Sequence, residues 1–370
     1  MDVIAAANAR QAALPAGAPP VIRMEVGQPG TGAPAGAVDA VAAALRSGDA
    51  LGYTEAFGRR SLRERIVAHY RNWYGLDVPI ERVAVTVGAS GAFPLAFLAA
   101  FDPGDRVALV SPFYPPYVNI LTALGMQPVI LEAGPDTRFQ PSVAMLERLD
   151  PPPDGLIVAS PCNPAGTMLH PDEFAAVAAW CDGADVRLIS DEIYHGLNYD
   201  SPITTAASLS PHAVVVNSFS KYFSMTGWRI GWLILPEDLV RPVECLAQNL
   251  FISAPFVSQV AAEAAFDCHD ELRANVARYR RSRDHLLQAL PEAGFTRLSS
   301  AEGAFYLFAD IADRSNDSTA FCARMLAEVG IAVTPGVDFD RTRGGRFLRF
   351  SYCGPEADMA AAAARLKGWR

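Results

Sequence analysis

Short runs of apolar, β-branched residues alternate with helical patterns from position 38 onward, and they constrain the fold more than any other feature. The runs cover residues 83–87, 106–110, 127–131, 155–159, 187–190, 213–217 and 230–235. Several are apolar throughout, whereas strands with one solvated face alternate between apolar and polar residues. The sequence therefore predicts an α/β fold with a mostly parallel seven-stranded sheet between helices.

Two domains are expected from the order of the patterns and from the length of 370 residues. Helical patterns at 38–46, 62–74, 91–100, 116–124 and 172–181 separate the strand-like runs, and a long charged helix is predicted at 273–290. Short strand-like segments and a closing helix at 356–367 follow it, which is typical of an α+β unit. We expect a large domain at 38–275, a small C-terminal domain at 276–370, and an N-terminal arm at 1–37 that joins the small domain.

Charge and composition exclude several classes of partner. The chain carries 31 Lys and Arg against 40 Asp and Glu, a net charge of −9, so nucleic acid is not expected as a partner. No run reaches the roughly 18 apolar residues that a membrane helix needs. Six isolated cysteines and an N-terminus without a basic leader predict a reduced, cytoplasmic protein with no metal site.

The densest polar cluster follows the run 213–217. It contains Ser218, Lys221 and Arg229. A lysine removed from water has a lowered pKa and forms a Schiff base with an aldehyde, while a hydroxyl and a guanidinium together suit a phosphate. A lone lysine is more often a surface charge, so this interpretation depends on what lies nearby.

Two more polar clusters follow neighbouring runs. Asp191 and Tyr194 come at the end of 187–190, and Asn163 follows 155–159. In an open parallel sheet the carboxyl ends of the strands form the binding crevice. An aspartate suits a pyridinium nitrogen, and Tyr and Asn suit a phenolate oxygen. Taken singly, Asp191 is as readily an N-cap and Asn163 a turn residue.

Together these motifs resemble a known family. SPCNPAGT (160–167), SDEIY (190–194) and SFSKYFSMTGWRIG (218–231) occur in the family's order, between VGQP (26–29) and LRFS (348–351). The sequence resembles the class I/II, fold-type I aminotransferases that use pyridoxal 5′-phosphate (PLP), and within them the bacterial aspartate and aromatic aminotransferases. The resemblance implies the PLP-dependent transferase fold of type I and a homodimer.

The resemblance also implies residue roles. Lys221 would form the Schiff base with PLP and carry the proton, Asp191 would hold the pyridine nitrogen protonated, and Tyr194 would hydrogen-bond the phenolic oxygen. Further PLP contacts fall on Asn163, on Tyr114 against the ring, and on Gly88, Ala89, Ser90, Ser218, Arg229 and the neighbouring subunit's equivalent of Tyr53 around the phosphate. The substrate contacts fall on Arg349 for the α-carboxylate, Gly27 and Asn163.

The implied reaction passes an amino group from an L-amino acid to a 2-oxo acid in two half-reactions. Two alternatives stay open: a β C–S lyase on the same scaffold, and a non-catalytic PLP-binding regulator domain. An aspartate substrate is not assigned, because Ser90 stands where some acid-specific relatives have a lysine. Only Arg23, Arg59 and Arg297 are candidates for a second carboxylate-binding cation.

Overall fold

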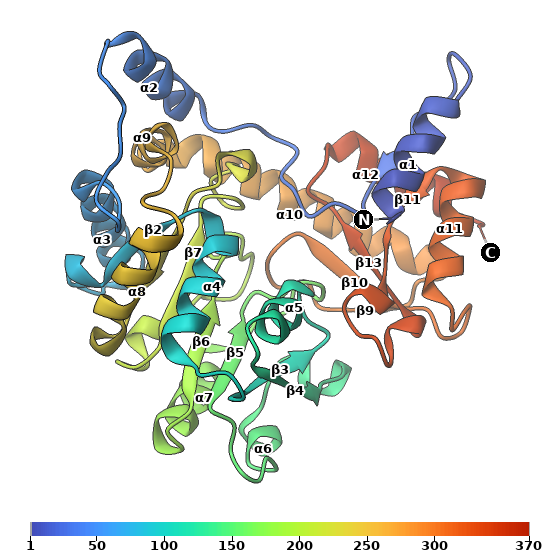
Figure 1. The fold of residues 1–370 in the computed structure, drawn as a ribbon. Coiled ribbons are helices and arrows are strands. Elements are labelled where there is room, and N and C mark those ends of the chain that lie inside the picture. The colour runs from blue at the N-terminus through green and yellow to red at the C-terminus, as the bar shows by residue number, and fades with distance from the viewer. Residues whose placement is uncertain (1, 370) are drawn as a thin grey trace.

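The central sheet of the computed structural model, which describes residues 2–369, has seven strands in the order β2-β8-β7-β6-β5-β3-β4 (Figure 1). All neighbours pair in parallel except β8, which is antiparallel to both β2 and β7. The strands are β2 (Val83–Thr86), β3 (Arg106–Ser111), β4 (Gln127–Glu132), β5 (Gly155–Ala159), β6 (Arg187–Asp191), β7 (Val214–Ser218) and β8 (Gly231–Ile234). The predicted mostly parallel seven-stranded sheet is confirmed.

Both faces of this sheet are buried, as the uniformly apolar runs predict. In β7, Val214 and Val216 pack on one face against α4 (Gly88–Ala100), α5 (Pro116–Ala123) and α8 (Glu237–Leu250). Val215 faces the other side, against α3 (Arg60–Tyr74), α7 (Pro171–Gly183) and α9 (Phe256–Ala265). Since successive side chains of a strand point to opposite faces of the sheet, one run of valines contributes to the hydrophobic cores on both faces.

A second, antiparallel sheet lies beside the first and has the order β12-β13-β10-β9. Its strands are β9 (Arg297–Leu298), β10 (Tyr306–Asp310), β12 (Thr334–Pro335) and β13 (Phe347–Ser351). Two helices, α11 (Ser318–Val329) and α12 (Glu356–Leu366), pack around it, as Figure 1 shows in orange and red. The N-terminal segment joins this part, because β1 (Ile22–Arg23) pairs in parallel with β11 (Ile331–Ala332).

Several helices have no counterpart in the predicted pattern: α1 (Asp2–Ala13), α6 (Val143–Leu146), α8, α9 and α11. The alanine-rich α1 buries only Ala7, so its sequence does not show the apolar stripe that predicts a helix. Contacts with α11 and β11 hold this helix in place. The predicted helices α2 (Ala35–Arg46) and α10 (His269–Glu292) are present, and α10 runs without a break through position 275 (Figure 1). The domain boundaries at 37/38 and 275/276 stay a prediction.

Within residues 2–369, every helix is too short or too polar to cross a bilayer. The six cysteines at positions 162, 181, 245, 268, 322 and 353 are all free thiols. The exposed Cys245 lies on α8, and Cys162, Cys181, Cys322 and Cys353 are buried.

Two isoleucines of the central sheet test how much each strand position contributes to stability. Ile189 in β6 is fully buried, whereas Ile130 in the edge strand β4 is 44% exposed. Ile189→Ala should lower the free energy of unfolding by about 2–5 kcal/mol, because it leaves a cavity in a packed core. Ile130→Ala should lower it by about 1 kcal/mol or less. Urea denaturation of both variants at one protein concentration measures the difference, and equal losses would contradict this account.

Candidate active site

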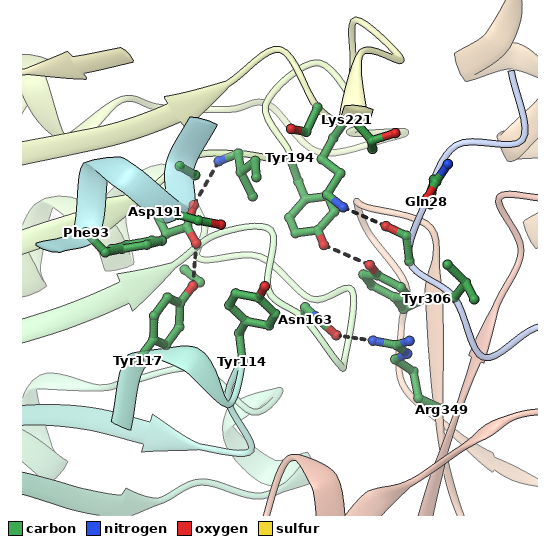
Figure 2. Close-up of a pocket in the computed structure, with 18 of the residues that line it drawn as sticks. Gln28, Phe93, Tyr114, Tyr117, Asn163, Asp191, Tyr194, Lys221, Tyr306 and Arg349 are labelled. Atoms are coloured by element: carbon green, nitrogen blue, oxygen red, sulfur yellow. Dashed lines mark hydrogen bonds between the residues drawn. The ribbon is translucent and has the colours of Figure 1, made fainter. Parts of the chain in front are cut away.

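The carboxyl ends of β5, β6 and β7 meet at one edge of the central sheet. Ala159 is aligned with Asp191, and Asp191 with Val216, so the residues that follow these strands are brought together. A cavity of about 380 Å³ opens at this edge, and its walls come from both sheets and the N-terminal segment (Figure 2). The cavity lies at the edge of the sheet where the sequence analysis expects the site.

Lys221 follows β7 and lies on the cavity wall. Its Nζ donates a hydrogen bond to the carbonyl oxygen of Gly27 at 2.6 Å and lies 5.8 Å from the centre of the Tyr194 ring. Desolvation lowers the pKa of Lys221 to about 8, since burial disfavours the ammonium form. A substantial fraction of the amine is therefore neutral and nucleophilic near physiological pH.

Asp191 ends β6 and is 4% exposed. Its Oδ2 accepts a short hydrogen bond from the Tyr117 hydroxyl, and its Oδ1 accepts one from the Ile193 backbone N–H at 3.1 Å (Figure 2). Burial raises the pKa of Asp191 to about 6, although both donors and the nearby Lys221 oppose the shift. The carboxylate is thus oriented and mostly ionised at neutral pH, ready to pair with a cation.

Glu192, the next residue, is fully buried but does not line the cavity. Its Oε1 accepts hydrogen bonds from the Ser190 and Thr205 hydroxyls and from the Ala206 N–H, while His195 Nδ1 lies 3.4 Å from Oε2. Burial raises the pKa of Glu192 to about 8. Most of it is protonated at pH 7, so Asp191 is the main negative charge contributed by this motif.

Arg349 extends from β13 of the second sheet into the cavity. It donates to Asn163 Oδ1 at 2.7 Å (Figure 2). It also donates to the Glu25 carbonyl at 2.6 Å and to Thr334 Oγ1 at 3.2 Å. Its Nε is buried and has no partner among the described residues. Because an unsatisfied buried donor is unfavourable, this edge of the guanidinium is suited to a ligand carboxylate.

The opposite end of the cavity is suited to an anion. Gly88 begins α4 with a φ of +66°, and a Cβ there would lie 2.5 Å from Arg229 Nη2, so only glycine lets the guanidinium approach the helix start. Arg229 also donates to the Thr226 carbonyl at 2.9 Å, and its Nη2 lies 3.4 Å from Ser90 Oγ. Helix N–H groups and a guanidinium at one point form an anion site.

The remaining predicted residues divide into two groups. Ala89, Ser90, Tyr114, Asn163, Tyr194 and Gly27 line the cavity with Lys221, Asp191, Arg229 and Arg349. Ser218 lies behind the wall, and its hydroxyl donates to Ser220 Oγ at 2.9 Å; Ser220 is the serine that faces the cavity. Tyr53 lies outside this chain's cavity and is 83% exposed.

Sequence reasoning did not assign Tyr117, Ser220 or Tyr306, whose hydroxyl-bearing side chains line the cavity. Tyr117 lies three positions after Tyr114, and this spacing could have placed both rings on one side of a helix start. Their ring centres are 5.5 Å apart. Tyr306 had no local signal, because its place depends on the pairing of β10 with β13.

Comparisons with known proteins agree on one family. The sequence model of aminotransferase class I and II matches residues 19–366. A valine–pyruvate aminotransferase of Mycobacterium tuberculosis is 50% identical over 94% of this chain and 91% of its own length. An aspartate/prephenate aminotransferase of Thermus thermophilus is 32% identical over 93% and 90%. A crystal structure of an aminotransferase from M. tuberculosis, 49% identical, superposes with a TM-score of 0.96 over 100% of this chain and 95% of that one.

The chain belongs to the aminotransferase class I and II family, and it is a PLP-dependent aminotransferase of fold type I. The predicted family, fold, reaction class and cofactor are confirmed, and amino acids and 2-oxo acids are its substrates. The names of these relatives favour transamination over the lyase and regulator alternatives.

The residues present fit PLP. The room that Gly88 leaves for Arg229 suits the phosphate, the Lys221 amine with its lowered pKa suits the aldehyde, and the buried Asp191 carboxylate suits the ring nitrogen. All three groups belong to the same site, and the orphaned Arg349 Nε marks a separate place for a carboxylate.

The pKa of Lys221 predicts how the apoenzyme takes up its cofactor. With a pKa of about 8, about one amine in ten is neutral at pH 7, against about one in 3,000 for an ordinary lysine. The rate of covalent attachment of PLP should rise with pH up to about 8 and then level off. Stopped-flow absorbance after mixing apoenzyme with PLP measures this rate. A rate that keeps rising beyond pH 10 would show that the amine is not desolvated, and Lys221→Ala should show no attachment.

Proposed function

We propose that this aminotransferase acts on L-amino acids with small, apolar side chains, with pyruvate or a similar small 2-oxo acid as the partner substrate. The proposal rests on which positively charged side chains line the cavity. Among the described residues, Lys221, Arg229 and Arg349 are the lysines and arginines that line it. Each suits a group common to every substrate or to the cofactor, so none is left for a side-chain carboxylate.

The three arginines considered for such a carboxylate lie elsewhere in the fold. None of them lines the cavity, and each has a carboxylate partner of its own. The pairs are Arg23 with Glu25, Arg59 with Glu263 at 3.2 Å, and Arg297 with Asp310 and Asp313. Recruiting any of them would break an existing ion pair.

Apolar side chains from the N-terminal part of the chain also line the cavity. Ile4 from α1 and Val26 from the N-terminal segment line the same cavity, and Ile4 is 39% exposed. A branched aliphatic side chain packed against them would bury apolar surface, worth about 0.8 kcal/mol per CH₂. The relative that is 50% identical is named for valine and pyruvate, which supports the same substrate class here.

The proposed roles of the site residues follow from the groups they face. When bound, PLP supplies an electron sink for the pair left on the substrate Cα. Lys221 Nζ, unprotonated in part at pH 7, would take the proton from Cα, and Asp191 would keep the ring nitrogen protonated. Tyr194 and Asn163 would hydrogen-bond the phenolic oxygen, and Arg349 would bind the α-carboxylate. Tyr114 would cover the ring, while Gly88, Ala89, Ser90, Ser220 held by Ser218, and Arg229 would bind the phosphate.

A homodimer in the cytoplasm is part of the same proposal. Tyr53 is exposed, and the next residue, Thr54, donates its N–H to Ser253 Oγ at 3.4 Å, one position after Ile252, which is 47% exposed. Phe251 in turn approaches Gly91 of α4, near the phosphate end of the cavity. Exposed apolar residues grouped beside the site favour a subunit contact there, with Tyr53 reaching the neighbouring site. The six free thiols are compatible with a reducing compartment.

Arg349 should control substrate affinity. Arg349→Lys keeps the charge but loses the fork that binds a carboxylate through two nitrogens, so kcat/KM for the amino acid should fall about tenfold to a hundredfold, mainly through KM. Arg346→Lys is the matched control, because Arg346 lies three residues earlier and forms an ion pair with Asp310 away from the cavity. Steady-state kinetics of both variants give the comparison, and equal losses would contradict the assignment of Arg349.

The substrate class is tested by the first half-reaction. Holoenzyme mixed with one L-amino acid and no oxo acid should change its absorbance to that of pyridoxamine phosphate. We expect L-valine and L-alanine to react, and L-aspartate to react at least about a hundredfold more slowly, because an unpaired carboxylate would have to leave water. Aspartate reacting as well as valine would overturn the substrate class. Release of ammonia in place of the absorbance change would overturn transamination.

A further inference from the structure

Tyr306 lies outside the sequence motifs described above. It lines the cavity between Tyr194 and Arg349. Its hydroxyl oxygen lies 2.8 Å from that of Tyr194 (Figure 2). Its ring lies 4.4 Å from the guanidinium carbon of Arg349. One buried side chain thus contacts both the residue proposed for the phenolic oxygen and the residue proposed for the α-carboxylate.

The contact between the two hydroxyls has a defined direction when a ligand is bound. Burial raises the pKa of Tyr306 to about 12 and that of Tyr194 well above 10, so both keep their protons at neutral pH. One of the two hydroxyl protons forms the hydrogen bond between the tyrosines, and the other proton can be donated to a ligand. If Tyr194 donates its proton to a phenolic oxygen, its own oxygen must accept the proton of Tyr306, and such a chain strengthens the outer hydrogen bond.

The ring of Tyr306 acts on Arg349 in a different way. A guanidinium 4.4 Å from an aromatic ring is attracted to its face, and the ring of Phe339 lies 4.9 Å from the same guanidinium. Between these rings the guanidinium donates hydrogen bonds to Asn163 and to the Glu25 carbonyl, while its Nε has no partner among the described residues. The aromatic pair therefore fixes the direction in which Arg349 presents its unpaired donor.

The lack of a side chain at Gly27 leaves room for the same tyrosine. A Cβ at this position would lie 2.0 Å from the Tyr306 hydroxyl oxygen, which no real contact allows. The carbonyl of Gly27 also accepts the hydrogen bond from Lys221 Nζ. At Gly27 the N-terminal segment passes directly over Tyr306. This contact sets the position of the Gly27 carbonyl, which accepts the hydrogen bond from Lys221.

We propose that Tyr306 is a positioning residue for transamination, which supports the hydrogen bond from Tyr194 to the cofactor's phenolic oxygen through its hydroxyl and orients Arg349 through its ring. This inference rests on the proposed roles of Tyr194 and Arg349. It divides the side chain into two functional parts, and the hydroxyl can be removed without the ring.

The experiment compares four holoenzymes: wild type, Tyr306→Phe, Tyr306→Leu and Tyr70→Phe. Tyr306→Phe removes the hydroxyl and keeps the ring, and Tyr306→Leu removes both. Tyr70→Phe is the matched control, because Tyr70 is equally buried and its oxygen accepts a hydrogen bond, from Trp232 Nε1 at 3.3 Å, outside the cavity. The readouts are the pH midpoint of the bound cofactor's absorbance change, and KM and kcat for the amino acid donor.

Tyr306→Phe should raise the absorbance midpoint by about 0.5 to 1 unit, because the phenolic oxygen loses part of its hydrogen-bond support and the site keeps its proton to higher pH. Its KM should stay within about twofold of wild type. Tyr306→Leu should raise the midpoint as well and also raise KM by about tenfold, since the ring beside Arg349 is gone. Tyr70→Phe should leave both quantities as in wild type.

An unchanged midpoint in Tyr306→Phe would overturn the inference, and so would an equal shift in Tyr70→Phe. Tyr306→Phe alone decides the role of the hydroxyl, and a folded Tyr306→Leu whose KM stays as in wild type would overturn the role of the ring. The wild type separates this inference from the proposed function. If it does not react with any L-amino acid, the function fails; if it reacts and Tyr306→Phe behaves like it, only the role of Tyr306 fails.

Discussion

Parallel pairing of β5, β6 and β7 is the constraint on which the rest of the site depends. Because the three strands run in the same direction and in register, with Ala159 beside Asp191 and Asp191 beside Val216, they end together. Asp191 is the last residue of β6, and Asn163 and Lys221 follow the ends of β5 and β7, although the three residues are far apart in the sequence. A slip of one residue would turn Asp191 to the other face of the sheet, so the packing of valines and isoleucines on both faces also determines the chemistry.

The same burial determines the charges of the site. Removal from water lowers the pKa of Lys221 to about 8 and raises those of Asp191 and Glu192 to about 6 and about 8. The two adjacent carboxyl groups differ because Asp191 has the Tyr117 hydroxyl and lies near the lysine, whereas Glu192 faces the interior. The protein thus keeps an amine of lowered pKa and the mostly ionised carboxylate of Asp191 in one cavity. An active site of this kind is less stable than an apolar core of equal volume, and the surrounding sheet compensates for it.

The sequence predicts the fold and the chemically distinctive residues well, and their neighbours poorly. The seven strands are visible because apolar runs depend on local composition, and Lys221, Asp191, Asn163 and Arg349 lie in motifs that are specific over short windows. The antiparallel direction of β8 is not visible, because periodicity carries no direction; the chain turns back over residues 219–230 without a crossover helix. Tyr306, Tyr117 and the choice of Ser220 over Ser218 as the serine at the cavity depend on contacts between distant segments, which no local pattern encodes.

The pairing of β1 with β11 has a consequence for the order in which the polypeptide is made. Ile331, the strand partner of Ile22, is added to the chain 309 residues after it. At about 5–20 residues per second this interval lasts roughly 15–60 s. During that time the segment carrying Gly27 lacks the strand it pairs with, and Cys353, which accepts the Gly30 N–H through its carbonyl, has not been synthesised. The central sheet can form while the chain is growing, whereas the cavity at its edge closes only after residues 331–353 have been added.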